Sequence, residues 1–528
     1  MQRLRTHRRI WLILAAAIAV LLLAPFAFLF SGLFGGDNVV WDHLKSTVLS
    51  GYVYNSLVLI AGVGLSTLVL GLSLALLTSR YRFPGVGFFK IALLMPLALP
   101  SYIAAYAFSG MVGYAGPLHL LFLEQGIDGM HFSIMSKVGL IAVLSLVLYP
   151  YVFATARVAL ESRYNSYIES ARALGLSRLR TFWKVILPLL RPALIGGVFL
   201  VMMEVLNDYG AMKYFGVPTF TTGIFTAWFS MGDLNAAVRL ALLLFVVVAT
   251  LSFTESRVHA QHKVHESHRS GKLLPTPLRG WRAAGATVFA GLVFIIAFVA
   301  PVAYLIWLLK QANVDAALAE WPKLASNSLV SGLSGTAVVL VLVLFTQFVR
   351  LLVKSGFSFF IGKSISLGYT LPGAIIAVGV LLFSALLDRQ TGAQLALTGS
   401  FTMLVFAYAI RFSGVAYQPL HAESEKRSAR MFEAAQSLRL RPLALLRKVY
   451  LPLSMPGIKI AAILVMIDVL KELPLTLILR PFNFSTLATK AFEYADDEML
   501  GRAALPALSV IVVGVIPVLL LHRMLKSS

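Results

Sequence analysis

The sequence lacks cysteine and has few charged residues. None of its 528 residues is cysteine, and only 13% are Asp, Glu, Lys or Arg. The absence of cysteine excludes disulfides, thiol chemistry and cysteine-ligated zinc or iron–sulfur centres. A phosphate-binding loop is also missing, because the nearest candidate, residues 356–364, has five residues between its glycines where the motif requires four. Since no catalytic triad or dinucleotide fingerprint is found either, we expect the chain to catalyse no covalent reaction.

Apolar residues dominate instead, at 59% of the chain. Uncharged apolar runs of about 20 residues are long enough to cross a bilayer. We predict an all-α polytopic membrane protein with about 12 transmembrane helices. The predicted spans are residues 10–30, 55–77, 88–111, 138–160, 192–208, 236–253, 283–309, 327–349, 365–387, 395–418, 456–472 and 505–521. Pro96, Pro100 and Pro372 interrupt apolar runs and predict kinks.

The distribution of charge predicts the topology. The chain has 45 basic and 23 acidic residues, for a net charge of +22. This excess does not require a nucleic-acid partner, because Lys and Arg concentrate in cytoplasmic loops that face anionic lipid. Basic residues cluster in the N-terminal head, residues 161–191, residues 254–282 and the C-terminal tail, whereas 31–54 and 209–235 have few. We therefore expect both termini to be cytoplasmic.

The two halves of the chain repeat each other. Several motifs recur at one constant offset, which equals half the length of the chain. These pairs are Glu169 and Glu433, Pro188 and Pro452, 204–208 and 468–472, and 220–223 and 484–487. Further upstream the offset is slightly longer, as for the NSLV motifs at 55–58 and 327–330. We therefore predict two parallel six-helix repeats, residues 1–253 and 283–528, joined by a cytoplasmic linker at 254–282.

Two polar segments of equal length interrupt the apolar runs, at 169–188 and 433–452. In the first segment, Gly175 is a natural helix stop and Ser177 is a suitable cap for the next helix. We expect Pro188 to end that second helix. Each segment is therefore predicted to form two short helices joined by a turn at the membrane surface.

These segments resemble the cytoplasmic loop signature of the permease subunits of bacterial ATP-binding-cassette importers. The signature is Glu-Ala-Ala, three residues, glycine, nine residues and Ile-x-Leu-Pro. The matching residues are Glu169, Ala171, Gly175, Val185, Leu187 and Pro188 in the first copy, and Glu433, Ala434, Ala435, Val449, Leu451 and Pro452 in the second. Ser170 replaces the first alanine of copy one, and Arg439 replaces the glycine of copy two. An ordinary amphipathic surface helix is the alternative, but it does not explain the duplication.

The resemblance implies a fold, a location and a set of partners. The fold is that of the MetI-like, binding-protein-dependent importer permeases of the bacterial inner membrane. Each loop docks on one of two copies of an ATPase subunit, which bind ATP and Mg, so this chain needs no cofactor of its own. A periplasmic or lipid-tethered binding protein delivers the substrate. Because arginine tolerates left-handed backbone poorly, we expect the turn at Arg439 to differ from that at Gly175.

Nearly the whole chain is similar to the fused permeases that import ferric iron. The segments 207–229 and 469–498 carry this resemblance, which implies Fe³⁺ import by alternating access. The thiamine and 2-aminoethylphosphonate permeases have the same layout and stay open as alternatives. A secondary transporter driven by an ion gradient leaves the two projecting loops unexplained. A non-transporting receptor or scaffold has no need of carboxylates near the axis.

Four carboxylates near the ends of two spans are candidates for the substrate pathway. Glu204 and Asp208 are four residues apart on one helix face, and Asp468 and Glu472 repeat this spacing in the other half. Ionisable groups within spans are costly and usually face a cavity or a partner. We therefore expect Glu204 and Asp468 to line the pathway.

Oxygen donors near these carboxylates suit a hard cation such as Fe³⁺, although we assign no metal ligand. Tyr209 and Tyr214 are further donors of this kind. The alternative is that Asp208 and Glu472 lie in water at the outer helix end, with Lys471 as a salt partner.

Four histidines recur at every third residue of the linker: His259, His262, His265 and His268. On a helix this spacing drifts across the surface and does not form one face. We interpret the run as part of a solvated linker and not as a metal sensor.

Overall fold

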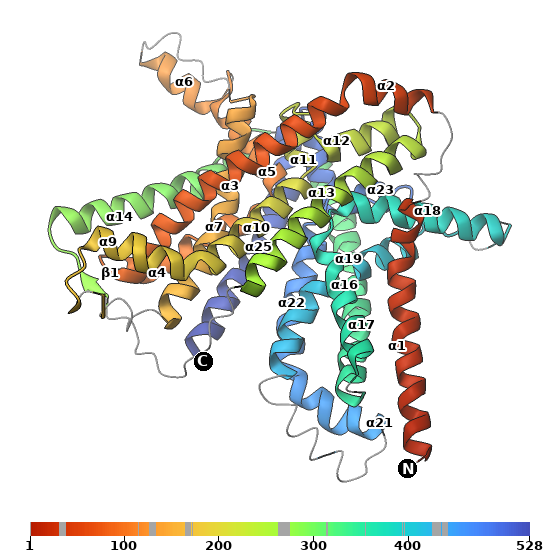
Figure 1. Ribbon diagram of the computed structural model, residues 1–528. Helices are drawn as coiled ribbons and strands as arrows, with labels where there is room; N and C mark the ends of the chain where they lie inside the picture. Colours follow the sequence, from red (N-terminus) through yellow and green to blue (C-terminus); the bar gives the residue numbers. More distant parts are fainter. Residues whose placement is uncertain are drawn as a thin grey trace. The chain divides into compact units, whose positions relative to one another are not determined.

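The computed structural model consists almost entirely of helices (Figure 1). It describes residues 2–30, 38–114, 116–125, 134–163, 170–171, 173–261, 275–312, 315–353, 355–392, 394, 396–424, 435 and 442–527. Within these residues the only strands are β1 (Tyr81–Arg82) and β2 (Thr276–Pro277), which pair in parallel. The all-α prediction is therefore confirmed.

The described residues form two compact units, each assembled from separate parts of the sequence. Unit 1 contains Met1–His43, Ile224–Phe245 and Leu318–Lys490, and unit 2 contains Leu44–Gly223, Val246–Ala317 and Ala491–Ser528. The predicted repeats, 1–253 and 283–528, divide the sequence differently. The first helix of the first repeat therefore belongs to unit 1, together with the central helices of the second repeat. The first span of the second repeat, Trp281–Gln311, belongs to unit 2, together with the central helices of the first repeat.

Unit 2 is centred on α3 (Leu49–Arg80), α7 (Lys137–Arg163) and α10 (Leu187–Asn207), which pack pairwise. Helix α3 approaches α7 closely at Gly71, where a Cβ atom would lie 2.9 Å from the Tyr149 carbonyl oxygen. Small residues at such crossings allow membrane helices to pack backbone against backbone. The other helical elements of this unit are α4 (Val86–Ala92), η2 (Met95–Ala98), α5 (Ser101–Val112), α6 (Pro117–Glu124), α9 (Arg178–Thr181), η3 (Phe182–Ile186), α11 (Gly210–Tyr214), α14 (Trp281–Phe294), η5 (Ile295–Val299), α15 (Ala300–Gln311) and α25 (Leu500–Ser527).

Unit 1 has an equivalent centre of three helices, α16 (Asp315–Leu352), α19 (Phe401–Glu423) and α22 (Leu451–Leu470). Helix α16 meets the other two at Gly335, beside Tyr408 of α19 and Val469 of α22. The other helical elements of this unit are α1 (Gln2–Leu29), α17 (Gly356–Ser366), η6 (Leu367–Thr370), α18 (Gly373–Gln390), α21 (Pro442–Leu445), η8 (Leu446–Tyr450), α23 (Pro474–Leu479) and η4 (Thr226–Ser230). Besides α16, whose first three residues belong to unit 2, four helices contribute residues to both units: α2 (Val39–Thr47), α12 (Phe220–Phe225), α13 (Leu234–Gln261) and α24 (Leu487–Asp496).

The first helix of each repeat packs on helices of the other repeat in the same way. In unit 1, α1 lies beside α17 and α18, where Gly379 allows the backbone at Pro25 to approach (Figure 1). The rings of Phe28 and Phe383 add a contact at 5.8 Å. In unit 2, α15 lies beside α5, where Gly110 makes room for the ring of Tyr304. This exchange is why the compact units cut across the two sequence repeats.

Ten helices of the described residues are long and apolar enough to cross a membrane, or eleven if one bent pair counts as a span. The bent pair, Val86–Ala98 with Ser101–Leu121, turns by 95° and replaces the straight span predicted at 88–111. The span predicted at 395–418 is formed by α19, which contains Arg411 and is not among the ten. The predicted number of about twelve therefore becomes ten or eleven by length and composition.

The predicted linker at 254–282 is partly regular. Helix α13 continues to Gln261, so it includes the first eight linker residues and His259. At the other end, β2 and the start of α14 occupy the last residues. His262, His265 and His268 lie outside the described residues, so the interpretation of the histidine run stays a prediction.

Candidate functional site

The first predicted coupling segment forms the turn that its sequence indicates. Gly175 has a φ of +80°, the left-handed conformation that glycine adopts at helix ends. The N–H of Leu176 donates to the carbonyl of Ala171 at 3.1 Å, and the N–H of Leu174 donates to Ser170 at 3.0 Å. The bond from Leu176 to Ala171 is the long-range bond of a Schellman motif. The predicted helix stop at Gly175 is therefore present.

The helix after this turn begins as predicted but does not end as predicted. The Ser177 hydroxyl accepts the N–H of Arg180 at 3.4 Å, and the Ser177 carbonyl accepts that of Thr181 at 2.8 Å. The helix then continues from α9 through the π-helical turn η3 into α10. The expectation that Pro188 ends a helix is wrong, because Pro188 lies in the first turn of α10. The wider π turn accommodates the proline ring and the missing N–H.

The second segment repeats this construction. Helix α21 continues through the π-helical turn η8 into α22, and Pro452 lies in the first turn of α22 as Pro188 does in α10. Ala435 is buried in a hydrophobic cluster with Leu445 and Tyr450. The cluster fixes this part of the segment against its own unit. The described C-terminal parts of both predicted coupling segments are thus continuous with a long apolar helix.

The structure describes only part of the coupling signature. Glu169, Glu433, Ala434 and Arg439 lie outside the described residues. The expected difference between the turns at Gly175 and Arg439 therefore stays a prediction. In both copies the leucine of the Leu-Pro pair, Leu187 or Leu451, is the first residue of the long α-helix.

The first segment exposes large apolar side chains. Leu174, Leu179 and Trp183 are 82%, 69% and 60% exposed, whereas Ala171 is buried. Exposed apolar side chains that gather on one segment are typical of surfaces that contact a partner or lipid.

At the opposite end of α10 and α22, a carboxylate caps the next short helix in each unit. Asp208 Oδ1 accepts the N–H of Ala211 at 2.9 Å, at the start of α11. Glu472 Oε1 accepts the N–H of Leu475 at 3.0 Å, at the start of α23. The alternative that Asp208 and Glu472 lie in water is wrong, because they are only 8% and 6% exposed. Their hydrogen bonds satisfy backbone donors that would otherwise be buried without a partner.

The two buried carboxylates have different partners. Ser101 hydrogen-bonds to Asp208, whereas Arg411 forms an ion pair with Glu472, with 3.1 Å between Nε and Oε2. Gly373 follows Pro372 as Ser101 follows Pro100. A Cβ atom at Gly373 would lie 2.7 Å from Arg411 Nη1 and 2.8 Å from Glu472 Oε1. The glycine therefore makes room for the ion pair.

The inner carboxylates, Glu204 and Asp468, are half-buried and more accessible than the outer pair. Tyr151 Oη donates to Glu204 Oε1 at 3.3 Å. Lys471, the salt partner named in the alternative that places Glu472 in water, forms its ion pair with Asp468, at 2.9 Å. Their accessibility is compatible with a place on the pathway, which stays a prediction.

Burial also affects ionisation at the end of α10. Asp208 follows Asn207, the last residue of the candidate span. Burial raises the pKa of Asp208 to about 6, although hydrogen bonds from Ser101 and Ala211 favour its charged form. Burial likewise raises the pKa of Tyr209.

A hydrogen-bonded threonine turn follows in each half. The N–H of Thr219 donates to Thr222 Oγ1 at 2.7 Å, and the N–H of Thr486 donates to Thr489 Oγ1 at 2.9 Å. The predicted pairing of 220–223 with 484–487 instead places Thr219 opposite Asn483. That pairing is therefore wrong, because the second turn begins later in the chain than the sequence motif indicates.

An asparagine ties each threonine turn to a long helix. Asn55 Nδ2 donates to the Pro218 carbonyl at 2.8 Å in unit 2. Asn327 Nδ2 donates to the Ser485 carbonyl at 3.0 Å in unit 1. Each accepting carbonyl belongs to the residue before the first threonine of its turn. The two turns are therefore structurally equivalent, although the sequence motifs alone pair them incorrectly.

Several tyrosines lie together in unit 2, near the threonine turn that begins at Thr219, where Thr221 Oγ1 donates to the Asp208 carbonyl. Phe492 contacts the rings of Tyr102 and Tyr209, with centroids 6.3 and 5.5 Å away. The ring of Tyr106 lies 6.3 Å from that of Tyr214. The hydroxyl of Tyr106 is buried and has no hydrogen-bond partner within the part of the chain that the structure describes. Such a polar atom is costly unless something else binds it.

Two carboxylates complete this tyrosine–carboxylate cluster (Tyr102, Tyr106, Tyr209, Tyr214, Asp496 and Glu498). Asp496 is close enough to interact electrostatically with both Tyr209 and Tyr214, and Glu498 interacts with Tyr214. Both carboxylates are exposed, and Glu498 has a φ of +60°. Burial raises the pKa of Tyr214, a hydrogen bond with Ser109 opposes the increase, and the two carboxylates add to it.

Sequence reasoning selected Tyr209 and Tyr214 but missed the other four members of the cluster. Tyr102 and Tyr106 come from α5, whereas Asp496 ends α24 and Glu498 lies in the turn after it, far away in the chain. The single available signal was the segment 469–498, which carries the ferric-iron resemblance and contains Asp496 and Glu498. Among the residues described here, no group of three His, Cys, Asp or Glu side chains is placed to hold a metal ion. The cluster offers phenol and carboxylate oxygens instead, which are hard donors.

Known proteins with similar sequences are transport proteins. Residues 67–264 match the family described as binding-protein-dependent transport system inner membrane component. The chain is 26% identical over 475 residues to the Fe(3+)-transport system permease protein FbpB 2 of Haemophilus influenzae, and the alignment covers 89% of each chain. It is 33% identical over 146 residues to the sulfate transport system permease protein CysT of Salmonella typhimurium, covering 28% of this chain and 51% of that protein. It is also 30% identical over 147 residues to the sulfate transport system permease protein CysT of Escherichia coli, covering 28% of this chain and 51% of that protein.

Proposed function

From the match of residues 67–264 to the family of binding-protein-dependent transport inner membrane components, we propose that this chain is the permease subunit of an ATP-driven importer. The chain itself is then not an enzyme. Two copies of a separate ATPase dock on the segments 169–188 and 433–452 and hydrolyse ATP with Mg. A periplasmic or lipid-tethered binding protein delivers the substrate from the other side. Both coupling segments and both termini face the cytoplasm of a bacterial cell.

The observation that carries this proposal is the unbroken helix between the coupling turn and Asp208. The candidate span Leu179–Asn207 has 29 residues, as does Pro442–Leu470 in the other half. At a rise of 1.5 Å per residue, each is about 44 Å long. Because a packed helix moves as a rigid body, displacement of the turn at Gly175 displaces the capped end at Asp208. ATPase closure is thereby transmitted to the outer side.

Ferric iron is the substrate that the chemistry favours. A relative that is similar over both repeats is a permease of Fe(3+) transport. Fe³⁺ is a hard cation that prefers oxygen donors. The tyrosine–carboxylate cluster supplies them near the end of α10 that is remote from the coupling turn. The buried hydroxyl of Tyr106 gains a partner when the cation binds there.

Other substrates fit these residues less well. Thiamine and 2-aminoethylphosphonate are the alternatives within the same layout of permease. Sulfate is the substrate in the names of the partial matches, but it is a dianion that Asp496 and Glu498 repel. An ion-gradient-driven transporter has no use for two coupling segments.

Iron uptake by cells that lack their own ferric permease tests the substrate assignment. We expect the double variant Tyr106→Phe, Asp496→Asn to reduce uptake about tenfold or more, because the first change removes an oxygen donor and the second removes a negative charge beside the cation. Tyr149→Phe is the matched control, since Tyr149 is also a buried tyrosine whose hydroxyl has no partner among the described residues. Uptake that is unchanged in the double variant, or reduced equally in the control, contradicts the assignment.

A further inference from the structure

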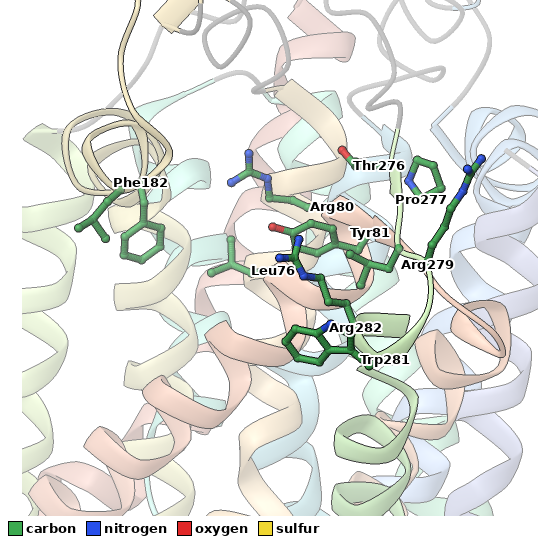
Figure 2. A pocket seen from close by; sticks show the side chains of 11 residues that line it. Leu76, Arg80, Tyr81, Phe182, Thr276, Pro277, Arg279, Trp281 and Arg282 are labelled. Atoms are coloured by element: carbon green, nitrogen blue, oxygen red, sulfur yellow. The ribbon is translucent and has the colours of Figure 1, made fainter. Parts of the chain in front are cut away.

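A basic pocket of about 830 Å³ lies in unit 2, beside the first coupling segment (Figure 2). Three of its lining residues are arginines, Arg80, Arg279 and Arg282, and none of the described lining residues is acidic. Apolar side chains, including Leu179 and Phe182, complete the wall. The pocket therefore combines positive charge with an apolar surface.

The strand pair β1–β2 holds the arginines in place. Tyr81 pairs with Thr276, and the N–H of Leu278 donates to the carbonyl of Arg82 at 2.9 Å. This pairing fixes the chain before α14 against the end of α3. Figure 2 shows the guanidinium groups of Arg80 and Arg282 on the side that faces Phe182, whereas Arg279 extends in the other direction.

The pocket lies at the level where the chain leaves the membrane. Arg80 is the last residue of the candidate span Leu49–Arg80, and Leu179 and Trp281 are the first residues of two others. Trp281 is 79% exposed and contacts the guanidinium group of Arg282, 5.5 Å from the ring centroid. Tryptophan and arginine at span ends are typical of the boundary between hydrocarbon and water.

We propose that this pocket binds the phosphate of an anionic phospholipid headgroup. Arginine pairs with phosphate oxygens through two parallel hydrogen bonds, and Arg80 and Arg282 are positioned to do so together. The apolar wall at Leu76, Phe182 and Pro277 suits the glycerol and the first acyl carbons. Basic pockets between spans bind such headgroups, and the volume is that of a small-ligand site.

A bound headgroup links two functional parts of the chain. Leu179 and Phe182 belong to the helix that follows the coupling turn, whereas Trp281 and Arg282 begin the first span of the second repeat. The lipid stabilises their arrangement and raises coupled ATP hydrolysis. This consequence rests on the proposed function, but the binding itself does not.

Native mass spectrometry of the detergent-solubilised full chain, titrated with defined lipids, tests the binding. We expect phosphatidylglycerol to bind about thirtyfold more tightly than phosphatidylcholine, from a factor of about five for each arginine. Arg80→Gln with Arg282→Gln should remove this preference. Arg82→Gln is the matched control, because Arg82 is an exposed arginine of β1, two residues after Arg80, and does not line the pocket. Equal binding of both lipids, or an equal loss in the control, overturns the proposal.

Two further arms separate the possible sources of phosphate and the possible causes of failure. Inorganic phosphate and ATP, added at the same concentration, should not displace phosphatidylglycerol; displacement assigns the site to a soluble phosphate and overturns the lipid proposal. Arg282→Gln alone, with an expected fivefold loss, replaces the double variant if that one does not fold. A complex that binds the lipid but imports nothing refutes the proposed function and leaves the lipid site standing.

Discussion

Replacement of Glu472 by glutamine should destabilise the chain by removing one charge of a buried ion pair. Arg411 Nε lies 3.1 Å from Glu472 Oε2, and the two side chains are only 8% and 5% exposed. Loss of one partner from such a pair costs about 3–5 kcal/mol, because the remaining charge stays desolvated. Glutamine still accepts the N–H of Leu475, so we expect a loss near the lower limit, about 3 kcal/mol.

A double variant separates the charge effect from the shape of the side chains. Arg411→Met combined with Glu472→Gln removes both charges, so we expect the double variant to be more stable than Glu472→Gln alone. The free energy of unfolding, obtained by titrating the detergent-solubilised chain with a denaturing detergent, measures both. A double variant at least as unstable as the single one refutes the reasoning.

The equivalent position in the other unit provides the control. Asp208 accepts hydrogen bonds from Ser101 and from the backbone of Ala211, and neither donor is charged. Asp208→Asn therefore leaves no unpaired charge, and we expect a cost of about 1 kcal/mol. A similar cost for Asp208→Asn and Glu472→Gln shows that the ion pair has no special role.

Three further predictions concern the coupling turn, the asparagine ties and the pathway. Gly175→Val forces a branched side chain into left-handed backbone at a cost of about 1–2 kcal/mol, and ATP hydrolysis by the assembled complex should lose its response to substrate; a retained response contradicts the coupling role. Asn55→Ala and Asn327→Ala each remove one hydrogen bond, so each should lower the free energy of unfolding by about 1 kcal/mol, and a clear difference between them argues against equivalent turns. Glu204→Ala with Asp468→Ala should reduce iron uptake, and unchanged uptake at normal expression removes both residues from the pathway.

Features that depend on local chemistry could be predicted from the sequence. Apolar runs identified the long helices, and Gly175 and Ser177 marked a helix end and a helix start that the structure contains. The offset of half the chain length correctly paired Asp208 with Glu472, because both occupy the same cap. Such features need only a few neighbouring residues.

Features that depend on tertiary packing could not be predicted. The pair of Arg411 with Glu472 joins α19 to the end of α22, whereas the one partner that the sequence suggested, in the alternative with Glu472 in water, was the adjacent Lys471. The exchange of first helices and the tyrosine–carboxylate cluster likewise unite distant segments. The prediction that Pro188 ends a helix was wrong for a different reason. The effect of this proline depends on the preceding π turn, which the sequence pattern does not indicate.

The most direct test of the proposed function is transport by the complex reconstituted in lipid vesicles with its ATPase and binding protein. We predict that Fe³⁺-loaded binding protein stimulates ATP hydrolysis and that iron accumulates inside only when ATP is hydrolysed. Binding protein loaded with thiamine or 2-aminoethylphosphonate should do neither. Iron accumulation driven by an ion gradient without the ATPase, or ATP-driven uptake of one of the other substrates in place of iron, contradicts the account.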